Sequence, residues 1–348
     1  MKTTKLGKSD ISVSAMTIGC WPFGGGEYWG EQSQKDVDMV VHAALDQGVN
    51  TFDTAEMYNN GASELSLGKA LKGYREKAVI ISKISPSNCR QVRKHCEASL
   101  QRLGTDYIDV YMLHWPINKL SLEHFTSDND VIGLPPTVEE AYAQLEELKQ
   151  EGLIRLIGMS NFGCSQMAEV LATEVQVDVN EICYNIVSRA IEAEIAPYCM
   201  ANKISIIGSM GLQQGVLAGI YKTPQEVPMH QAHSRHFTDS RGGGTSRHGE
   251  KGAEKELFEV VEQLRGIAND LHIHMAQLSV AWILKKPFMA STLVGSRNLK
   301  ELEMNIAACS LEIPDPVEAL IDRISLPVLE TLGNNPDYYE HSSKSRIY

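Results

Sequence analysis

Short apolar runs alternate with amphipathic helical patterns along most of the chain. Each run has the length of one strand and is bounded by polar or turn-forming residues, which favours repeated β–α units around a parallel sheet. The runs predict eight strands, at residues 15–19, 49–53, 78–84, 107–115, 153–160, 179–183, 204–209 and 291–295. Eight such units close into a barrel, so the pattern predicts an α/β fold of the (β/α)8 TIM-barrel type.

Helical periodicity fills the intervals between these runs. The first helix is predicted after Ser33, which with Asp36 resembles a capping box, and Gly48 ends it. Thr137 and Glu140 form a second such pair before a helix at 138–152. Further helices are predicted at residues 61–71, 88–104, 164–173 and 191–201, and in segments from 254 to 284.

One domain is predicted for residues 1–348, since no linker interrupts the alternation. Residues 1–14 read as a hairpin that could plug one barrel end. Two loops are long, at about 117–136 and at 213–251, and long loops in compact domains tend to be functional or mobile. The polar C-terminal tail, 326–348, could fold over the barrel mouth or be disordered.

Composition and charge limit the classes of partner that this protein is expected to bind. The chain is 43% hydrophobic and 22% charged, as globular proteins are, and it has neither an apolar run long enough to span a membrane nor a signal-peptide pattern at its start. We therefore expect a cytoplasmic protein. Its seven cysteines are scattered, which favours reduced thiols, and its net charge of −12 disfavours nucleic acid and membrane surfaces. A small-molecule ligand is expected, and the oligomeric state stays open.

Polar residues end four successive predicted strands: Asp53, Lys83, His114, and the pair Ser160 and Asn161. In this fold the active site forms at the carboxyl ends of the strands, although any one such residue could simply be a cap or a solvated end. A buried charge needs a partner, so Asp53 is expected to pair with Lys83. A lysine near Tyr58 would lower the pKa of that phenol and make it a usable general acid.

Four segments together resemble the aldo-keto reductases: FDTAEMY at 52–58, SK at 82–83, LHW at 113–115 and GMSNF at 158–162. The resemblance implies NAD(P)H-dependent enzymes on a (β/α)8 barrel with a catalytic tetrad, here Asp53, Tyr58, Lys83 and His114. It implies hydride transfer from nicotinamide C4 to a carbonyl carbon while Tyr58 protonates the oxygen. Lys83, held by Asp53, would tune Tyr58, and His114 would orient the carbonyl.

The resemblance also implies a nicotinamide dinucleotide, NADP(H) in preference to NAD(H). Ser160 and Asn161 would bind the nicotinamide carboxamide. The Gln that the family usually adds on the next strand corresponds to Asn180, and the usual stacking aromatic corresponds to Ser209, so another ring such as Trp21 could compensate. The remaining residues expected around this end of the cofactor are Gly19, Cys20, Asp53 and Met210.

Leu212, Gln214 and Gly215 would lie along the pyrophosphate by the same resemblance. Arg235 could clamp a phosphate or be a solvated loop charge.

The segment VGSRNLKELEMN resembles the family's site for the adenosine end. Gly295 and Ser296 would offer backbone donors, and Arg297 could pair with a 2′-phosphate. Glu301 and Asn305 stand where Gln and Asn usually contact this end. The Glu301 carboxylate would repel a 2′-phosphate lying close to it, which opposes the contribution of Arg297.

The substrate side is expected to be aromatic, with Trp21, Tyr28, Trp29 and Trp115 beside Tyr58 and His114; core packing is the alternative for each of the four. The implied activity is reversible reduction of an aldehyde or ketone, including sugar-like ones. Two alternatives remain open: an NAD(P)⁺-dependent sugar or polyol dehydrogenase, and a cofactor-binding regulatory subunit of the potassium-channel β type. No metal is expected, because the histidines lack ligand spacing, and the glycine-rich stretches lack the Rossmann order.

Overall fold

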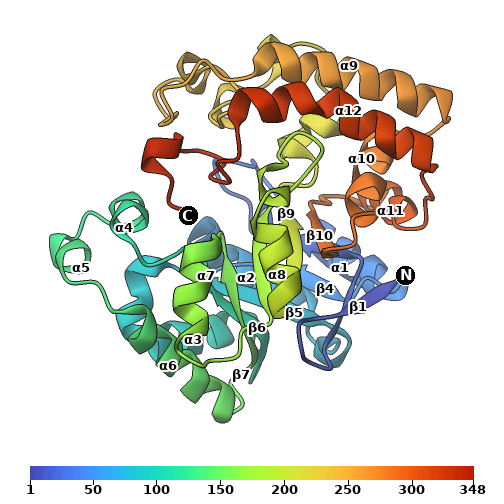
Figure 1. Cartoon of the computed structure of the whole chain (residues 1–348). Helices are drawn as coiled ribbons and strands as arrows, with labels where there is room; N and C mark the ends of the chain where they lie inside the picture. Colours follow the sequence, from blue (N-terminus) through green and yellow to red (C-terminus); the bar gives the residue numbers. More distant parts are fainter.

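Eight parallel strands form a closed barrel in the computed structural model, which describes residues 1–348 (Figure 1). Each strand pairs with the next along the chain, and the last pairs with the first. The barrel strands are β3 (Met16–Gly19), β4 (Thr51–Asp53), β5 (Val79–Ile84), β6 (Ile108–Leu113), β7 (Ile154–Ser160), β8 (Val179–Cys183), β9 (Ser205–Ser209) and β10 (Met289–Val294). The predicted TIM barrel is confirmed.

Helices surround the barrel and follow the predicted caps. The Ser33 side chain accepts a hydrogen bond from the Asp36 amide, and Thr137 forms a complete capping box with Glu140. The helices are α1 (Gln34–Asp46), α2 (Ala62–Ala70), α3 (Val92–Leu103), α4 (Lys119–Phe125), α5 (Asn129–Gly133), α6 (Val138–Gln150), α7 (Cys164–Leu171), α8 (Ile195–Asn202), α9 (Glu254–Asp270), α10 (Met275–Leu284), α11 (Leu299–Ala308) and α12 (Asp315–Leu332).

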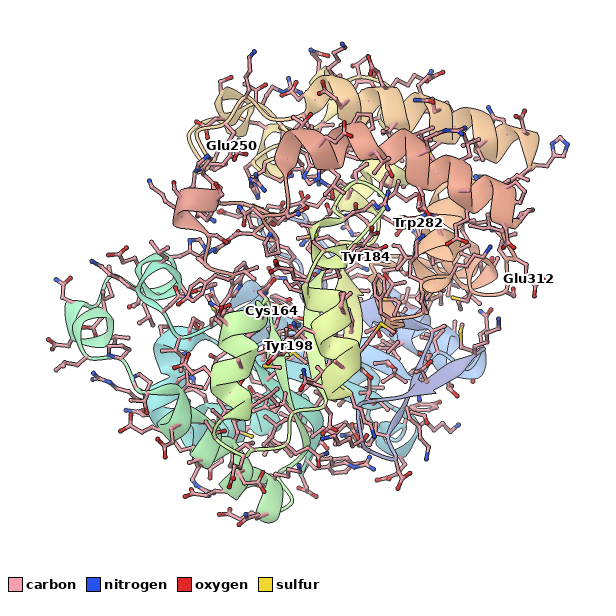
Figure 2. All side chains as sticks on the ribbon, in the orientation of Figure 1. Cys164, Tyr184, Tyr198, Glu250, Trp282 and Glu312 are labelled. Atoms are coloured by element: carbon pink, nitrogen blue, oxygen red, sulfur yellow. The ribbon has the colours of Figure 1, made fainter.

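Side chains on the outer face of the strands form the main core with these helices. Ile80, Tyr111 and Ile157 belong to it and are fully buried. Packing is close: a Cβ on Gly68 of α2 would lie 2.4 Å from the Leu103 carbonyl oxygen, so only glycine lets α2 approach α3 this far. Tyr184, after β8, stacks on Trp282 of α10 with ring centroids 5.5 Å apart and joins the barrel to the α9–α12 end (Figure 2).

An antiparallel hairpin closes the amino end of the barrel. Its strands are β1 (Thr3–Lys5) and β2 (Ser12–Ser14), and its Leu6, Ile11 and Val13 pack against inward-facing residues of the barrel strands. The Gly7 amide donates to Ser205 Oγ at the start of β9. The hairpin is therefore a plug at the end opposite the strand termini that carry the candidate chemistry.

The two long loops and the tail are ordered. Residues 117–136 contain α4 and α5, and 213–251 is a series of short 3₁₀ turns. The predicted tail began too early, because α12 runs to Leu332 through Pro327 and packs beside α9 (Figure 1). Residues 333–348 then return to the carboxyl ends of the strands, where Asn118 and Gln166 both donate to the Arg346 carbonyl oxygen. None of the helices is both long and apolar enough to cross a membrane.

Candidate active site

Strand alternation gathers the polar strand ends inside the barrel. Val79 and Ile81 of β5 belong to the barrel interior, so Lys83, two residues further, also points inward. Val110 and Met112 of β6 also belong to the barrel interior, so His114, two residues after Met112, points inward as well. By the same alternation, the side chains at the ends of β4, β7, β8 and β9 also point into the barrel; they are Asp53, Ser160, Glu181 and Ser209. These side chains form one polar layer at the mouth of an apolar barrel.

Lys83 is the centre of this layer. Its Nζ lies 2.5 Å from Asp53 Oδ2, 3.1 Å from the Thr54 carbonyl oxygen, 3.3 Å from the Tyr58 hydroxyl and 3.4 Å from Glu181 Oε1. The lysine side chain is 0% exposed. Burial alone would lower the pKa of Lys83, but the charge and hydrogen bond of Asp53 raise it, so the amine stays protonated.

Tyr58 is held over the mouth by a strained turn. Asn59 and Asn60 both have positive φ, at 50° and 53°, and the Asn59 amide donates to the carbonyl oxygens of Trp21 and Phe23. Burial raises the pKa of Tyr58, and Lys83 lowers it only in part. The lowering expected from Lys83 is present, but desolvation outweighs it, so the net shift of the Tyr58 pKa in the protein without ligand is upward.

His114 faces Tyr58 edge to face, with ring centroids 5.5 Å apart. Burial, with a further contribution from Lys83, holds the pKa of His114 well below its usual range, so the imidazole is neutral. Its Nδ1 is buried without a hydrogen-bond partner. The neutral imidazole lies beside the Tyr58 ring, so one of its ring nitrogens can bind a carbonyl oxygen that enters next to the Tyr58 hydroxyl.

Ser160 and Asn161 end β7 beside these residues. Asn161 adopts φ of 64°, which turns its amide back so that it donates to Ser160 Oγ and to the His114 carbonyl oxygen. Further round the barrel, Met210 and Gln214 also have positive φ in the turn after β9. Both polar atoms of the Gln214 amide are buried and unpartnered. Such groups are costly unless a ligand satisfies them, which fits a bound polar molecule.

Aromatic rings line one side of the mouth. Trp21 stacks on Tyr58 at 5.5 Å and on Tyr28 at 5.0 Å, and Trp29 meets Trp21 edge-on. The Tyr28 hydroxyl and Trp29 Nε1 are buried without partners. The structure thus brings together three of the four aromatic residues predicted on the substrate side.

The family model of the aldo/keto reductases matches residues 15–326. The chain belongs to this family. The NADH-specific methylglyoxal reductase of Escherichia coli (strain K12) is 30% identical over 348 aligned positions, which cover 90% of this chain and 95% of that protein. Aldo-keto reductase YhdN of Bacillus subtilis (strain 168) is 31% identical, with 87% of each chain covered. The crystal structure of an aldo-keto reductase from Klebsiella pneumoniae in complex with NADPH is 25% identical and superposes with a TM-score of 0.70 over 93% of this chain and 95% of that one.

This aldo-keto reductase is accordingly an oxidoreductase that acts on carbonyl groups. The four residues of the expected tetrad lie within one contact network around Lys83 Nζ and the Tyr58 ring. Of the residues at the first strand end, Cys20 is fully buried and Gly19 is paired with Asp53 across β3 and β4. Ser160, Asn161 and Ser209, which were expected at the nicotinamide end, lie at the ends of β7 and β9.

Asn180 does not lie at the cofactor site where it was expected. Its amide donates to the Phe162 carbonyl oxygen and to Met167 Sδ, and its oxygen accepts from the Phe162 amide, so the side chain lies outside the barrel against α7. The residue of β8 that faces the site is Glu181, which the sequence reasoning missed. The strand period of two accounts for this in the structure, because Val179 points inward and Glu181 shares its parity, whereas the sequence alone does not fix which parity faces the interior.

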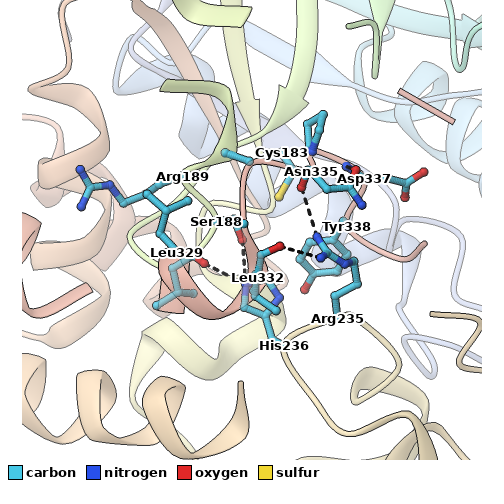
Figure 3. A pocket seen from close by; sticks show the side chains of 14 residues that line it. Cys183, Ser188, Arg189, Arg235, His236, Leu329, Leu332, Asn335, Asp337 and Tyr338 are labelled. Carbon is cyan, nitrogen blue, oxygen red and sulfur yellow. Dashed lines mark hydrogen bonds between the residues drawn. The ribbon is translucent and has the colours of Figure 1, made fainter. Parts of the chain in front are cut away.

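Arg235 fits neither of the two roles expected for it. It is not a solvated loop charge, since it is buried, and its guanidinium makes a bidentate ion pair with Glu250. It also donates to the carbonyl oxygens of Leu332 and Asn335 (Figure 3). With these donors engaged, Arg235 joins the 213–251 loop to the tail and does not present its charge to a phosphate.

Trp115 differs from the other three aromatic residues. It is 8% exposed, and the Arg346 guanidinium covers its ring at 3.7 Å from the centroid. The expected core-packing alternative therefore describes Trp115 in this structure, because the tail seals it from the mouth.

At the adenosine end, α11 begins with Asn298 as its cap. The Glu301 carboxylate accepts from the Arg297 amide at 2.9 Å and from Asn298 Nδ2 at 2.8 Å. The Arg297 side chain donates to Gln32 Oε1 and to the Glu31 carbonyl oxygen. Asn305 is buried and donates to Ser296 Oγ and the Gly295 carbonyl oxygen. The predicted residues do meet here, with a carboxylate at the helix end that attracts anions.

A separate cavity lies under the tail, between Ser188 after β8, His236 of the long loop and Tyr338 (Figure 3). Its volume is about 30 Å³, enough for a water molecule but not for a substrate. Cys183 lines it as a buried free thiol. No group of three or more His, Cys, Asp or Glu side chains is arranged to hold a metal ion.

Proposed function

We propose that this aldo-keto reductase reduces a small polar aldehyde or ketone, with Tyr58 as the general acid. The observation that carries the proposal is the position of the buried Lys83 Nζ, 3.3 Å from the Tyr58 hydroxyl and 2.5 Å from Asp53 Oδ2. A bound reduced nicotinamide dinucleotide supplies the hydride. We assign each of the other roles in the reaction to a side chain of this site.

Tyr58 transfers its phenolic proton to the carbonyl oxygen as negative charge develops there. The resulting phenolate forms beside the Lys83 ammonium, which stabilises it more strongly than water would because the site is buried. Asp53 keeps the ammonium in position, and neutral His114 holds the carbonyl oxygen with its ring nitrogen. The Tyr58 pKa, raised by burial in the free protein, keeps the proton on the phenol until the substrate oxygen needs it.

We propose Ser160, Asn161 and the unpartnered Gln214 as the residues that bind the nicotinamide end and the pyrophosphate. For the adenosine end we propose NADP(H) in preference to NAD(H), through Arg297. The preference is small, within about tenfold, because the Glu301 carboxylate lies at the start of α11 and already accepts from the Arg297 amide. The names of the relatives support both nucleotides, one being NADH-specific and one binding NADPH.

Substrate polarity follows from the unpaired groups at the aromatic wall. Trp29 Nε1 is a buried donor without a partner, and the Tyr28 hydroxyl lies beside the Gln214 amide, so a substrate that carries oxygen atoms next to its carbonyl would find donors on this side of the mouth. Sugar-like aldehydes and short dicarbonyl compounds have this character. The methylglyoxal reductase named among the relatives supports the same class.

The test combines nucleotide titration with turnover on a carbonyl panel that includes methylglyoxal and short sugars. Tyr58→Phe keeps the ring stacked on Trp21 but removes the proton, so kcat should fall by about 10²- to 10⁴-fold with nucleotide Kd unchanged. Tyr111→Phe is the control, because Tyr111 is a buried tyrosine that faces the helices instead of the barrel mouth and also has an unpartnered hydroxyl. Full turnover in Tyr58→Phe would remove the proposed acid. Nucleotide binding without turnover of any carbonyl or alcohol would favour a regulatory role.

A further inference from the structure

Glu181 lies inside the candidate active site. It is 4% exposed and occupies β8 directly opposite Ser160 of β7 in the strand register. Its Oε1 is 3.4 Å from Lys83 Nζ. The Asp53–Lys83 pair therefore has a second carboxylic acid beside it, which the reaction proposed above does not use.

The local charges do not balance if both acids are ionised. Lys83 carries the only positive charge, and Asp53 holds it at 2.5 Å, closer than Glu181 does. Asp53 Oδ1 and Glu181 Oε2 are both buried and have no hydrogen-bond partner. Two bare carboxylate oxygens in a dry site are costly, whereas one proton held between the acids neutralises the excess charge and gives these oxygens a donor.

The surrounding groups offer Glu181 no other cation. Besides Asp53 and Lys83, the titratable groups at this layer are Tyr58, neutral His114 and the buried thiol of Cys20. The neighbouring strands β7 and β9 contribute Ser160 and Ser209, which do not titrate. Burial, and after it the Asp53 charge, raise the pKa of Glu181 well above its ordinary value, while Lys83 opposes them only in part.

We propose that Glu181 carries a proton in the free enzyme and releases it to solvent when oxidised nicotinamide dinucleotide binds. The inference rests on the proposed function, because it takes the register neighbour Ser160 as a ligand of the nicotinamide carboxamide. The oxidised ring is a cation and supplies the positive charge that an ionised Glu181 lacks. The reduced ring is neutral, so Glu181 keeps its proton. Glu181 thereby favours oxidised cofactor increasingly as the pH rises.

Proton linkage gives the size of the effect. Where binding releases one proton, the association constant of the oxidised nucleotide rises by about tenfold per pH unit, between the Glu181 pKa in the complex and that in the free enzyme. Binding of the reduced nucleotide should show no such slope. The ratio of the two dissociation constants should therefore change with pH in the wild-type enzyme.

Calorimetric titration in buffers of different ionisation enthalpy measures the protons released. We expect the wild type to release up to about one proton with the oxidised nucleotide and almost none with the reduced one. Glu181→Gln keeps the shape and a neutral amide, so it should bind both forms with no difference in proton release. Glu194→Gln removes an exposed carboxylate on the loop after β8 and should match the wild type.

Equal proton release for the two nucleotides in the wild type, or unchanged release in Glu181→Gln, would overturn the inference. Should Glu181→Gln fail to fold, infrared difference spectra of the wild type decide: a carboxylic acid C=O band must disappear when the oxidised nucleotide binds, and a band that persists overturns the proposal. Failure of both nucleotides to bind would contradict the proposed function itself, and this inference with it.

Discussion

Lys83 and Asp53 form a salt bridge that solvent does not reach. Nζ lies 2.5 Å from Oδ2, and the two side chains are 0% and 1% exposed. The residues come from neighbouring strands, β5 and β4, whose register is fixed by the barrel. Because the same Nζ is 3.3 Å from the Tyr58 hydroxyl, the pair fixes a positive charge next to the phenol. The ammonium cannot leave without stranding a buried carboxylate.

Replacing this lysine should affect catalysis and stability together. In Lys83→Met we expect kcat to fall by about 10²- to 10⁴-fold, because the Tyr58 phenolate loses its neighbouring charge. The free energy of unfolding should fall by about 3–5 kcal/mol, because a buried ion pair is broken. Steady-state kinetics and urea unfolding measure the two quantities. In Lys5→Met, which removes the partner of the largely exposed Asp10, both should stay at wild-type values. Near-normal turnover in Lys83→Met would exclude the lysine from the mechanism.

Lowering the pH through the ordinary histidine range should not protonate His114 in the folded protein. Since burial and then Lys83 depress its pKa, carbonyl reduction should show no loss of kcat/KM on passing through the ordinary histidine range near about 6.5. Stability, unlike activity, should depend on pH in this range. Below about 6.5 the imidazole binds a proton in the unfolded chain but not in the folded one, so His114 disfavours folding as the pH falls. A pH–rate profile checks the first statement, and an acid limb near the ordinary value that is lost in His114→Gln would contradict it. His272→Asn is a control, because His272 is an exposed histidine after α9 whose positive φ asparagine tolerates.

The fold was predictable because the barrel repeats one pattern. Each apolar run is buried on both faces, and caps such as Thr137 with Glu140 mark where helices begin. The polar strand ends Asp53, Lys83 and His114 interrupt this pattern, and their convergence follows from parallel strands ending at one edge. The predicted start of the tail at 326 was wrong because α12, which was not predicted, continues through Pro327 to Leu332.

The errors in the site have physical reasons. On β8, Asn180 and Glu181 are both polar and both buried, so polarity alone did not show which one faced inward; the parity of Val179 did. Arg235 was misassigned because its acceptors at Leu332 and Asn335 lie far along the chain. The pKa of Tyr58 was misjudged because a nearby lysine is visible in sequence, whereas the extent of desolvation is not.

Cofactor selectivity should depend on Glu301. Its carboxylate accepts from the Arg297 amide at the start of α11, where a 2′-phosphate would seek the same donors and the same helix end. In Glu301→Gln the amide oxygen can still accept that hydrogen bond, but the negative charge is gone. We expect the Kd for NADPH to fall by about tenfold and the Kd for NADH to change little. Fluorescence titration of both nucleotides measures this, with the exposed Glu303→Gln on the same helix as control. Equal changes for the two nucleotides would place Glu301 away from the 2′-position.

The tail is held by one buried ion pair. Arg346 donates to Asp337 through Nε at 2.8 Å and Nη2 at 2.7 Å, and the side chains are 2% and 0% exposed. Burial alone would raise the pKa of Asp337, but the Arg346 hydrogen bonds and charge outweigh it and lower the pKa. With a depressed folded value, this stabilisation is present above the unfolded pKa of about 3.9 and is lost as the pH falls through the folded value.

Asp337→Asn should therefore release residues 333–348 before the barrel unfolds. The substitution leaves the Arg346 charge buried and without its counter-ion, at a cost of about 3–5 kcal/mol. The tail avoids that cost if it detaches, because Arg346 then moves from the Trp115 ring into solvent. We expect faster hydrogen exchange in the tail, measured by mass spectrometry, with protection of the barrel strands unchanged. Asp315→Asn breaks a surface pair with Lys285 in which the aspartate is 94% exposed, and it should leave tail exchange as in the wild type. Wild-type protection of the tail in Asp337→Asn would mean that the hydrogen bonds from Asn118 and Gln166 to Arg346 hold it without the ion pair.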